Sequence, residues 1–397
     1  MKTVFLDEGV LIFFILVPFL YPLLYSWAYN NEVVKQVPVA VVDRSNSSIS
    51  RQFVRLYDAS SETKVAYRCN DILEARDLVE KQVVHGFVVI PEDFDTRLNR
   101  SEQAHVSVFC DMSLLLTYKA LYKTAVEVVQ NMNGQIQVSV SNTPTRREET
   151  VQARPLDFEE VQLFNPTGGY GSFIIPGVLI LIIQQTLVLG IGLSAGTARE
   201  NNRYGDLVPV NRHYTRLSPI IFGKSLCYLM IYAVMGAWLT LAVPKIFHFT
   251  SLFYPNDLLH LMVPYVLACI FFGMFVSCIV RYRENIILLV VFASVPLLFL
   301  TGVSWPQTAI PSYWQGFSWL FPSTFGVRAF VRMNTMGATL ADVRDEYICL
   351  WVQMVVYFFA TYAVYRHQLL RTRRHALQTI ENIKQQIVQI KKSRNPK

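Results

Sequence analysis

The chain has 397 residues, of which 52% are hydrophobic and only 16% are charged, and its mean hydropathy is +0.30. A typical soluble domain carries about 25% charged residues, so this composition excludes a chain built only from soluble domains. Six cysteines and eighteen glycines in this length exclude a disulfide scaffold and a collagen-like repeat.

Six windows, each at least 19 residues long, contain no Asp, Glu, Lys or Arg. They are residues 9–31, 161–198, 225–244, 258–280, 285–327 and 347–365. A bilayer span needs roughly 20 apolar residues, and one charge at its centre costs about 2.5–3.5 kcal/mol. The sequence therefore predicts a polytopic α-helical membrane protein with six transmembrane helices.

The fifth window is too long for one helix, and a second crossing between Trp314 and Phe330 would give seven spans. Seven spans would place the basic C-terminal tail outside. Three prolines and three tryptophans also interrupt the second half of the window. We therefore expect one span over about 286–303, followed by an outer re-entrant or interfacial segment over 304–345 that does not cross.

The charges are distributed unevenly between the windows. Residues 30–170 hold 15 basic and 19 acidic residues, whereas the tail over 366–397 holds nine basic residues and one acid. The segment 197–224 and the short link with Arg281 and Arg283 are also basic. By the positive-inside rule we expect both termini in the cytoplasm and the 30–170 block outside. The expected location is the inner (cytoplasmic) membrane.

The first apolar stretch contains Pro18 and Pro22 and has only Lys2 as a basic n-region, which favours an uncleaved anchor over a signal peptide.

From the windows and the charges, the chain divides into four parts. Residues 1–30 hold the N-terminus and helix 1, 31–168 an extracytoplasmic α/β domain inserted between helices 1 and 2, 169–366 helices 2–6, and 367–397 a basic cytoplasmic tail.

The inserted block alternates strand-like and helix-like segments. The expected strands are residues 36–43, 63–68, 84–90 and 104–110, and the expected helices are 47–59, 71–82, a short one from Glu92, and 113–137. Such alternation predicts a mostly parallel sheet covered by helices. Cys69 and Cys110 would each end a strand of this sheet, and both a disulfide and two buried thiols remain open for them.

No catalytic, cofactor or metal site is predicted. Gly223-Lys224-Ser225 resembles the end of a phosphate-binding loop, but position 218 holds Ser where the motif needs Gly. The histidines and cysteines show no metal-ligand spacing. The tail lacks the aromatic side chains that would accompany nucleic-acid binding, so we expect it to contact anionic lipid headgroups and no nucleic acid.

Two polar features lie in or between the spans. Gln184 and Gln185 are amides in the middle of a span, and they could either bond another helix or line a substrate path.

The loop 199–218 is charged, with Tyr204, Leu207 and Val210 at three-residue intervals. It is either a plain surface loop or a docking element for a soluble partner. Its candidate docking residues are Arg199, Glu200, Arg203, Tyr204, Asp206, Leu207, Val210 and Arg212.

Several short segments, taken in order, resemble one family. They are Val39-Ala40-Val41-Val42-Asp43 with Ser50-Arg51, the run from Gly86 through Ile90-Pro91 to Phe94, Asn165-Pro166, Gly223-Lys224, and Gly302 with Pro306, Pro311 and Pro322. Together with six spans, they resemble the ABC-2 type transporter permease family, in the subgroup with a large extracytoplasmic domain between helices 1 and 2.

The resemblance implies a permease subunit of an ATP-driven ABC exporter, which moves substrate out of the cytoplasm or inner leaflet by alternating access. It would pair with a second permease subunit, identical or a paralogue, and with two cytoplasmic ABC ATPase subunits that dock at the 199–218 loop. ATP and Mg would be bound by those ATPases, and the chain would be no enzyme itself. Handover to a periplasmic adaptor and an outer-membrane duct is a further implication.

The loop departs from the family pattern, which has acids two and four residues before a Gly that Thr-Leu-Glu follows. Around Gly205 this chain has Asn201 and Arg203 before the glycine and Asp206-Leu207-Val208 after it. An alternative function is a non-transporting membrane receptor or assembly scaffold, with the extracytoplasmic domain as the binding module.

Overall fold

A computed structural model describes residues 7–30, 33–100, 102–140, 163–165, 169–200, 217–280 and 282–367. The chain forms two compact units. One contains Met1–Asn30 and Gly168–Lys397, and the other contains Asn31–Thr167. The part of the predicted docking loop that follows Glu200 and the basic tail after His367 lie outside the described residues.

The Asn31–Thr167 unit contains a four-stranded sheet with the order β2-β1-β3-β4. The strands are β1 (Val37–Asp43), β2 (Thr63–Arg68), β3 (Gly86–Ile90) and β4 (Ser107–Cys110). The β1 strand pairs in parallel with β2 and β3, which confirms a mostly parallel sheet, and β4 runs antiparallel to β3. An antiparallel edge strand is common on otherwise parallel sheets.

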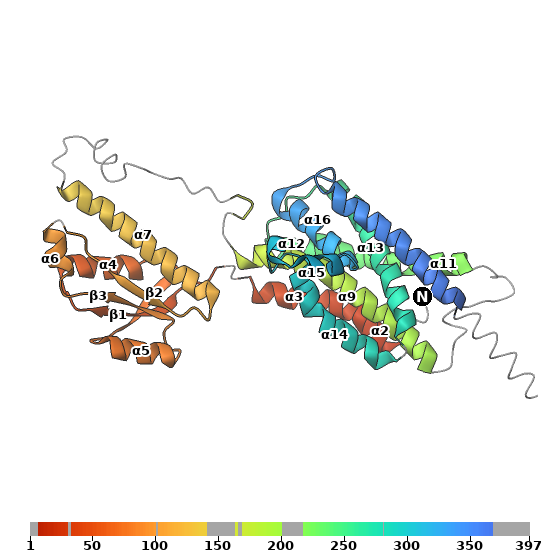
Figure 1. Ribbon diagram of the computed structural model, residues 1–397, viewed down its shortest axis with the longest axis horizontal. Coiled ribbons are helices and arrows are strands. Elements are labelled where there is room, and N and C mark those ends of the chain that lie inside the picture. Colours follow the sequence, from red (N-terminus) through yellow and green to blue (C-terminus); the bar gives the residue numbers. More distant parts are fainter. Residues whose placement is uncertain are drawn as a thin grey trace, which may run out of the picture. The chain divides into compact units, whose positions relative to one another are not determined.

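Helices cover both faces of this sheet (Figure 1). They are α4 (Ser48–Asp58), α5 (Ile72–Glu80), α6 (Phe94–Asn99) and α7 (Leu115–Val140). Successive side chains of a strand point to opposite faces, so β1 contributes side chains to two hydrophobic cores, one on each face of the sheet. Val39 packs with residues of α4 and α7, and Val42 packs with Ala75 of α5. Two-sided burial explains why β1 and β3 read as continuous apolar runs.

The second unit holds six helices, among the described residues, that are long and apolar enough to cross a membrane. They are Glu8–Ala28, Tyr170–Glu200, Leu217–Ile246, Pro255–Ile279, Arg283–Leu300 and Arg344–His367. The first comprises α2 (Glu8–Leu11), η1 (Ile12–Leu16) and α3 (Val17–Ala28). The second is α9, and the third comprises α11 (Leu217–Ala237), η2 (Trp238–Ala242) and α12 (Val243–Ile246). The fourth and fifth are α13 and α14. The described residues thus contain six helices of the length and composition predicted for the spans.

Three short helices follow α14, namely η3 (Gln307–Ala309), α15 (Ser312–Ser318) and α16 (Pro322–Met336). Proline begins α16, where its missing N–H costs nothing. The α16 helix packs against α9 and α13, with Phe330 fully buried. The long fifth window therefore contains one span and then broken helices, and a re-entrant or interfacial position for 304–345 stays a prediction.

The α9 helix is the most buried span, with 89% of its apolar window inside the protein, against 22–61% for the other five. Glycines let its neighbours approach closely. A Cβ at Gly190 would lie 2.7 Å from the Phe14 ring, and a Cβ at Gly192 would overlap Ile286 of α14. A Cβ at Gly196 would lie 2.9 Å from the Cα of Arg283. The small-xxx-small pair Gly192 and Gly196 therefore packs on α14, a partner that the sequence does not indicate.

We expect residues 31–165, expressed alone, to unfold cooperatively, because the sheet and helices enclose their own two cores. Reduction should leave the melting temperature unchanged, since Cys69 and Cys110 are free thiols beyond β2 and at the end of β4. These are opposite edges of the sheet, about 14 Å apart at the usual strand spacing, which a disulfide cannot bridge. A fall of many degrees on reduction, measured by circular dichroism, would contradict this arrangement.

Candidate functional site

The predicted docking loop begins at the end of α9. Arg199 and Glu200 are the last two residues of α9, and α11 begins at Leu217. The six other candidate docking residues lie outside the described residues, so their helix and contacts stay predictions. They are Arg203, Tyr204, Asp206, Leu207, Val210 and Arg212.

Arg199 and Glu200 join the end of α9 to the end of α13 and the start of α14. The Arg199 Nη1 donates a hydrogen bond to the carbonyl of Val280, the residue that follows the last turn of α13. The Glu200 Oε1 accepts one from the backbone N–H of Arg283, the first residue of α14, at 3.1 Å. Helix ends leave such backbone groups without intrahelical partners, and both side chains carry the charge that suits their helix end.

Arg283 connects the start of α14 to the first helix. Its Nη2 lies 3.3 Å from the Oδ1 of Asp7, and the two side chains are 35% and 16% exposed. The same Asp7 oxygen accepts hydrogen bonds from the N–H groups of Gly9 and Val10, at 3.1 and 3.4 Å. Asp7 is thus the N-cap of the first helix as well as the partner of Arg283.

In the sequence, Arg283 bears only on topology, as part of a basic link, and Asp7 is not among the predicted site residues. The local signal for Asp7 is an acid directly before an apolar helix, which is typical of an N-cap. No local pattern links it to Arg283, because the two residues are 276 positions apart.

Gln184 forms a contact between helices in the middle of α9. Its side chain is 1% exposed, and its Oε1 accepts a hydrogen bond of 2.6 Å from the N–H of Ser323 in the first turn of α16. That N–H has no partner inside its own helix, so an amide from α9 satisfies the start of α16. Nearby, the hydroxyl of Tyr265 donates to the Ile180 carbonyl at 2.6 Å, and that of Tyr232 donates to Thr186 Oγ1 at 2.8 Å.

Gln185 differs from its neighbour. Its side chain is half-buried, and among the described residues its Nε2 is a buried donor without a hydrogen-bond partner. A buried amide without a partner carries a desolvation cost that structures usually avoid. A polar group of that kind is what a transient polar ligand would require, so Gln185 keeps its place as a candidate for a substrate path.

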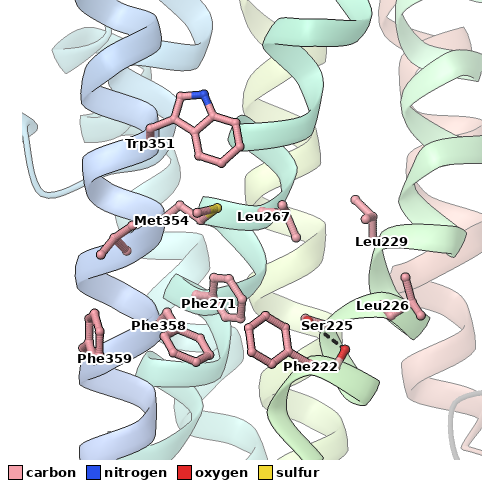
Figure 2. A pocket seen from close by; sticks show the side chains of 11 residues that line it. Phe222, Ser225, Leu226, Leu229, Leu267, Phe271, Trp351, Met354, Phe358 and Phe359 are labelled. Carbon is pink, nitrogen blue, oxygen red and sulfur yellow. Dashed lines mark hydrogen bonds between the residues drawn. The ribbon is translucent and has the colours of Figure 1, made fainter. Parts of the chain in front are cut away.

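A hollow of about 450 Å³ lies between α11, α13 and the Arg344–His367 helix (Figure 2). It is lined by Phe222, Ser225, Leu226, Leu229, Leu267, Phe271, Trp351, Met354, Val355, Phe358 and Phe359. The Ser225 hydroxyl is engaged, since it donates to the Phe222 carbonyl at 2.9 Å. The hollow therefore offers dispersion contacts to hydrocarbon and little to a polar solute. Neither Gln184 nor Gln185 lines it.

The motif-like run Gly223-Lys224-Ser225 lies within α11. A helical backbone directs its N–H groups along the helix axis to its own carbonyls, so this run does not form a loop that cradles phosphate. Among the described residues, no group of three or more His, Cys, Asp or Glu side chains could hold a metal ion.

Replacement of Gln184 by Leu should destabilise the bundle by about 1–3 kcal/mol, because it leaves the buried N–H of Ser323 without an acceptor. Gln185→Leu is the matched control, since the amide that it removes has no partner among the described residues. We expect thermal unfolding in detergent to show a lower melting temperature for the first variant and an equal or higher one for the second. A larger loss for Gln185→Leu would contradict the assignment of the two amides.

Comparison with known proteins identifies the family of this chain. A sequence model described as ABC-2 family transporter protein matches residues 9–363. No curated protein matches the chain. A solved domain attributed to an ABC type-2 transporter of Thermotoga maritima MSB8 is 20% identical and covers 30% of this chain and 81% of that chain, with a TM-score of 0.23, too low to carry an argument. Because the family match spans nearly all of the six helices, the chain belongs to the ABC-2 transporter family and is the multi-pass membrane subunit of an ABC transporter.

Proposed function

We propose that this chain is the permease subunit of an ATP-driven exporter in the inner membrane. The observation that carries the proposal is the family match over residues 9–363, in a family whose membrane subunits partner with ABC ATPases. Substrate would move from the cytoplasm or inner leaflet to the outside by alternating access between two arrangements of the spans. ATP and Mg would be bound and used by the ATPase subunits, with no cofactor on this chain.

The segment 199–218 is the proposed docking site for the ATPase. It separates two spans, α9 and α11, and it combines charged residues with Tyr204, Leu207 and Val210. Interface energy usually concentrates in a few aromatic or aliphatic anchors surrounded by polar groups. Arg199, Glu200, Arg203, Asp206 and Arg212 would supply that polar surround.

The remaining assembly follows from the distribution of charge. The basic tail and basic links would face the cytoplasm, which leaves the acidic Asn31–Thr167 unit outside. A second permease subunit, identical or a paralogue, would complete the transport path. An outer unit of this kind would also suit handover to a periplasmic adaptor and an outer-membrane duct, and Gln184 and Gln185 are the candidate residues of the substrate path.

We expect Leu207→Asp or Tyr204→Ala to abolish ATP-driven export and to weaken co-purification of the partner ABC ATPase, because each removes an apolar anchor from the proposed docking segment. Membrane insertion should remain normal. Replacement of Arg371 and Arg373 by Ala is the control, since it removes charge from the tail without touching the segment. Retention of the ATPase by the loop variants and its loss from the tail variant would move the docking site elsewhere.

Reporter fusions should locate both ends of the chain in the cytoplasm. A fusion after Lys397 should be active only with a cytoplasmic reporter, and one near residue 120 only with a reporter that needs export, because an even number of crossings would return the chain to the side on which it starts. A C-terminal fusion that is active only outside would contradict the proposed orientation.

A further inference from the structure

The residues Asp7, Arg199, Glu200, Val280 and Arg283 form what we call the end cluster. They come from the start of the first helix, the end of α9, the residue after α13 and the start of α14. Consecutive spans run in opposite directions, so these four helix ends belong to the same side of the membrane. Two hydrogen bonds and one ion pair join them.

The charges of the end cluster balance, and each charged side chain makes a contact within it, that of Asp7 through Oδ1 alone among the described residues. The guanidinium of Arg199 meets a carbonyl at the C-terminal end of α13, where the helix dipole is negative. The carboxylate of Glu200 meets an N–H at the N-terminal end of α14, where the dipole is positive. The remaining pair, Asp7 and Arg283, is opposite in charge and partly buried, so solvent screens it less than a surface pair.

Close packing leaves the end cluster little freedom to move. The Arg283 side chain lies directly over Gly9, where an added Cβ would overlap its Nη2. On its other side, a Cβ at Gly196 of α9 would approach the Cα of Arg283 to 2.9 Å. Arg283 is therefore held between the first helix and α9. A displacement of the end of α9 must move the start of α14 and, through Asp7, the start of the first helix.

We propose that Arg283 is a positioning residue that passes motion of the α9 end to the first helix and to α14, by its backbone bond to Glu200 and its ion pair with Asp7. The inference rests on the proposed function, in which an ATPase acts on the segment that begins at Arg199. A helix is stiff along its axis, so force on one end of α9 reaches other spans only through contacts at that end. The end cluster supplies such contacts to three other helices.

The two arms of Arg283 can be separated by mutation. Arg283→Gln removes the ion pair and keeps the backbone N–H that Glu200 accepts. Asp7→Asn removes the same ion pair and keeps an oxygen that can cap the first helix. If both variants act through one contact, the double variant should be no worse than either single variant.

Arg332→Gln is a matched control. Arg332 of α16 pairs with Glu346 at 3.1 Å, with side chains 42% and 18% exposed, close to the values of the Arg283 pair. The substitution Arg332→Gln therefore removes an ion pair of similar length and exposure between two other helices. Arg283→Lys is the conservative variant, since it keeps the charge beside Asp7 and loses only the planar guanidinium.

The experiment uses the full chain with the ABC ATPase that co-purifies with it, in lipid nanodiscs, and compares amide hydrogen exchange with and without ATP and vanadate. In the wild type we expect a nucleotide-dependent change in peptides from the first helix and from the start of α14. Arg283→Gln, Asp7→Asn and the double variant should reduce that change about fivefold, the lower range of typical coupling between sites. ATPase co-purification should persist, Arg283→Lys should retain most of the response, and Arg332→Gln should match the wild type.

The outcomes separate the inference from the proposed function. A wild-type response in Arg283→Gln and Asp7→Asn, an equal loss in Arg332→Gln, or a loss in Arg283→Lys as large as in Arg283→Gln would each overturn the role of the ion pair, while the ATPase still co-purified. If no ATPase co-purified with the wild-type chain, the proposed function would fail and the inference with it.

Discussion

Close approach of neighbouring helices to α9 is the constraint on which the membrane unit depends. In hydrocarbon, an apolar side chain gains little by exchanging lipid for protein, so span association relies on tight packing and on hydrogen bonds between helices. Glycines on α9 supply the packing, since Phe14 and Ile286 occupy the space that side chains at Gly190 and Gly192 would fill. Buried residues occur all along this helix, as expected for a helix that other helices surround.

The polar groups of α9 follow from the same constraint. A polar group in hydrocarbon has no water to bond, so each one needs a protein partner. Gln184 meets the start of α16, and Thr186 meets Tyr232 of α11. These bonds help to determine which helices lie beside α9. Each bond needs a donor and an acceptor from two helices at the same depth in the membrane. Among the described residues of α9, the Nε2 of Gln185 and the Oγ1 of Thr197 are buried without a hydrogen-bond partner. For Gln185, which lies in the middle of the span, a substrate path would explain the unpaired amide.

Charges gather where α9 leaves the bundle. The Arg199, Glu200 and Arg283 side chains would be costly inside the bilayer. At the helix ends, Arg199 and Glu200 meet backbone groups that helix formation leaves unsatisfied, and Arg283 pairs with Asp7. This arrangement gives each of these charged side chains a partner and joins four helix ends. The apolar hollow between α11, α13 and Arg344–His367 lies apart from these contacts and resembles the lipid around it in chemistry.

The sequence by itself determined the number of spans and the elements of the α/β unit. Charge-free windows and the alternation of strand and helix can both be read from short stretches of sequence. A charge inside the bilayer costs free energy, so a span lacks charged residues. An exposed apolar face also costs free energy, so apolar residues recur with the period of the helix or strand that buries them. The strand positions and the broken segment after α14 follow in the same way, from apolar runs and from Pro306, Pro311 and Pro322.

Only the tertiary structure decided which distant residues meet. The antiparallel edge of β4, the packing of Gly196 on α14, the bond from Gln184 to Ser323 and the pairing of Asp7 with Arg283 join positions up to 276 residues apart. Residue type and spacing say that a buried amide or charge needs a partner, and they do not say which one. The partner is fixed by the order in which the spans pack, because packing alone sets which groups reach the same depth.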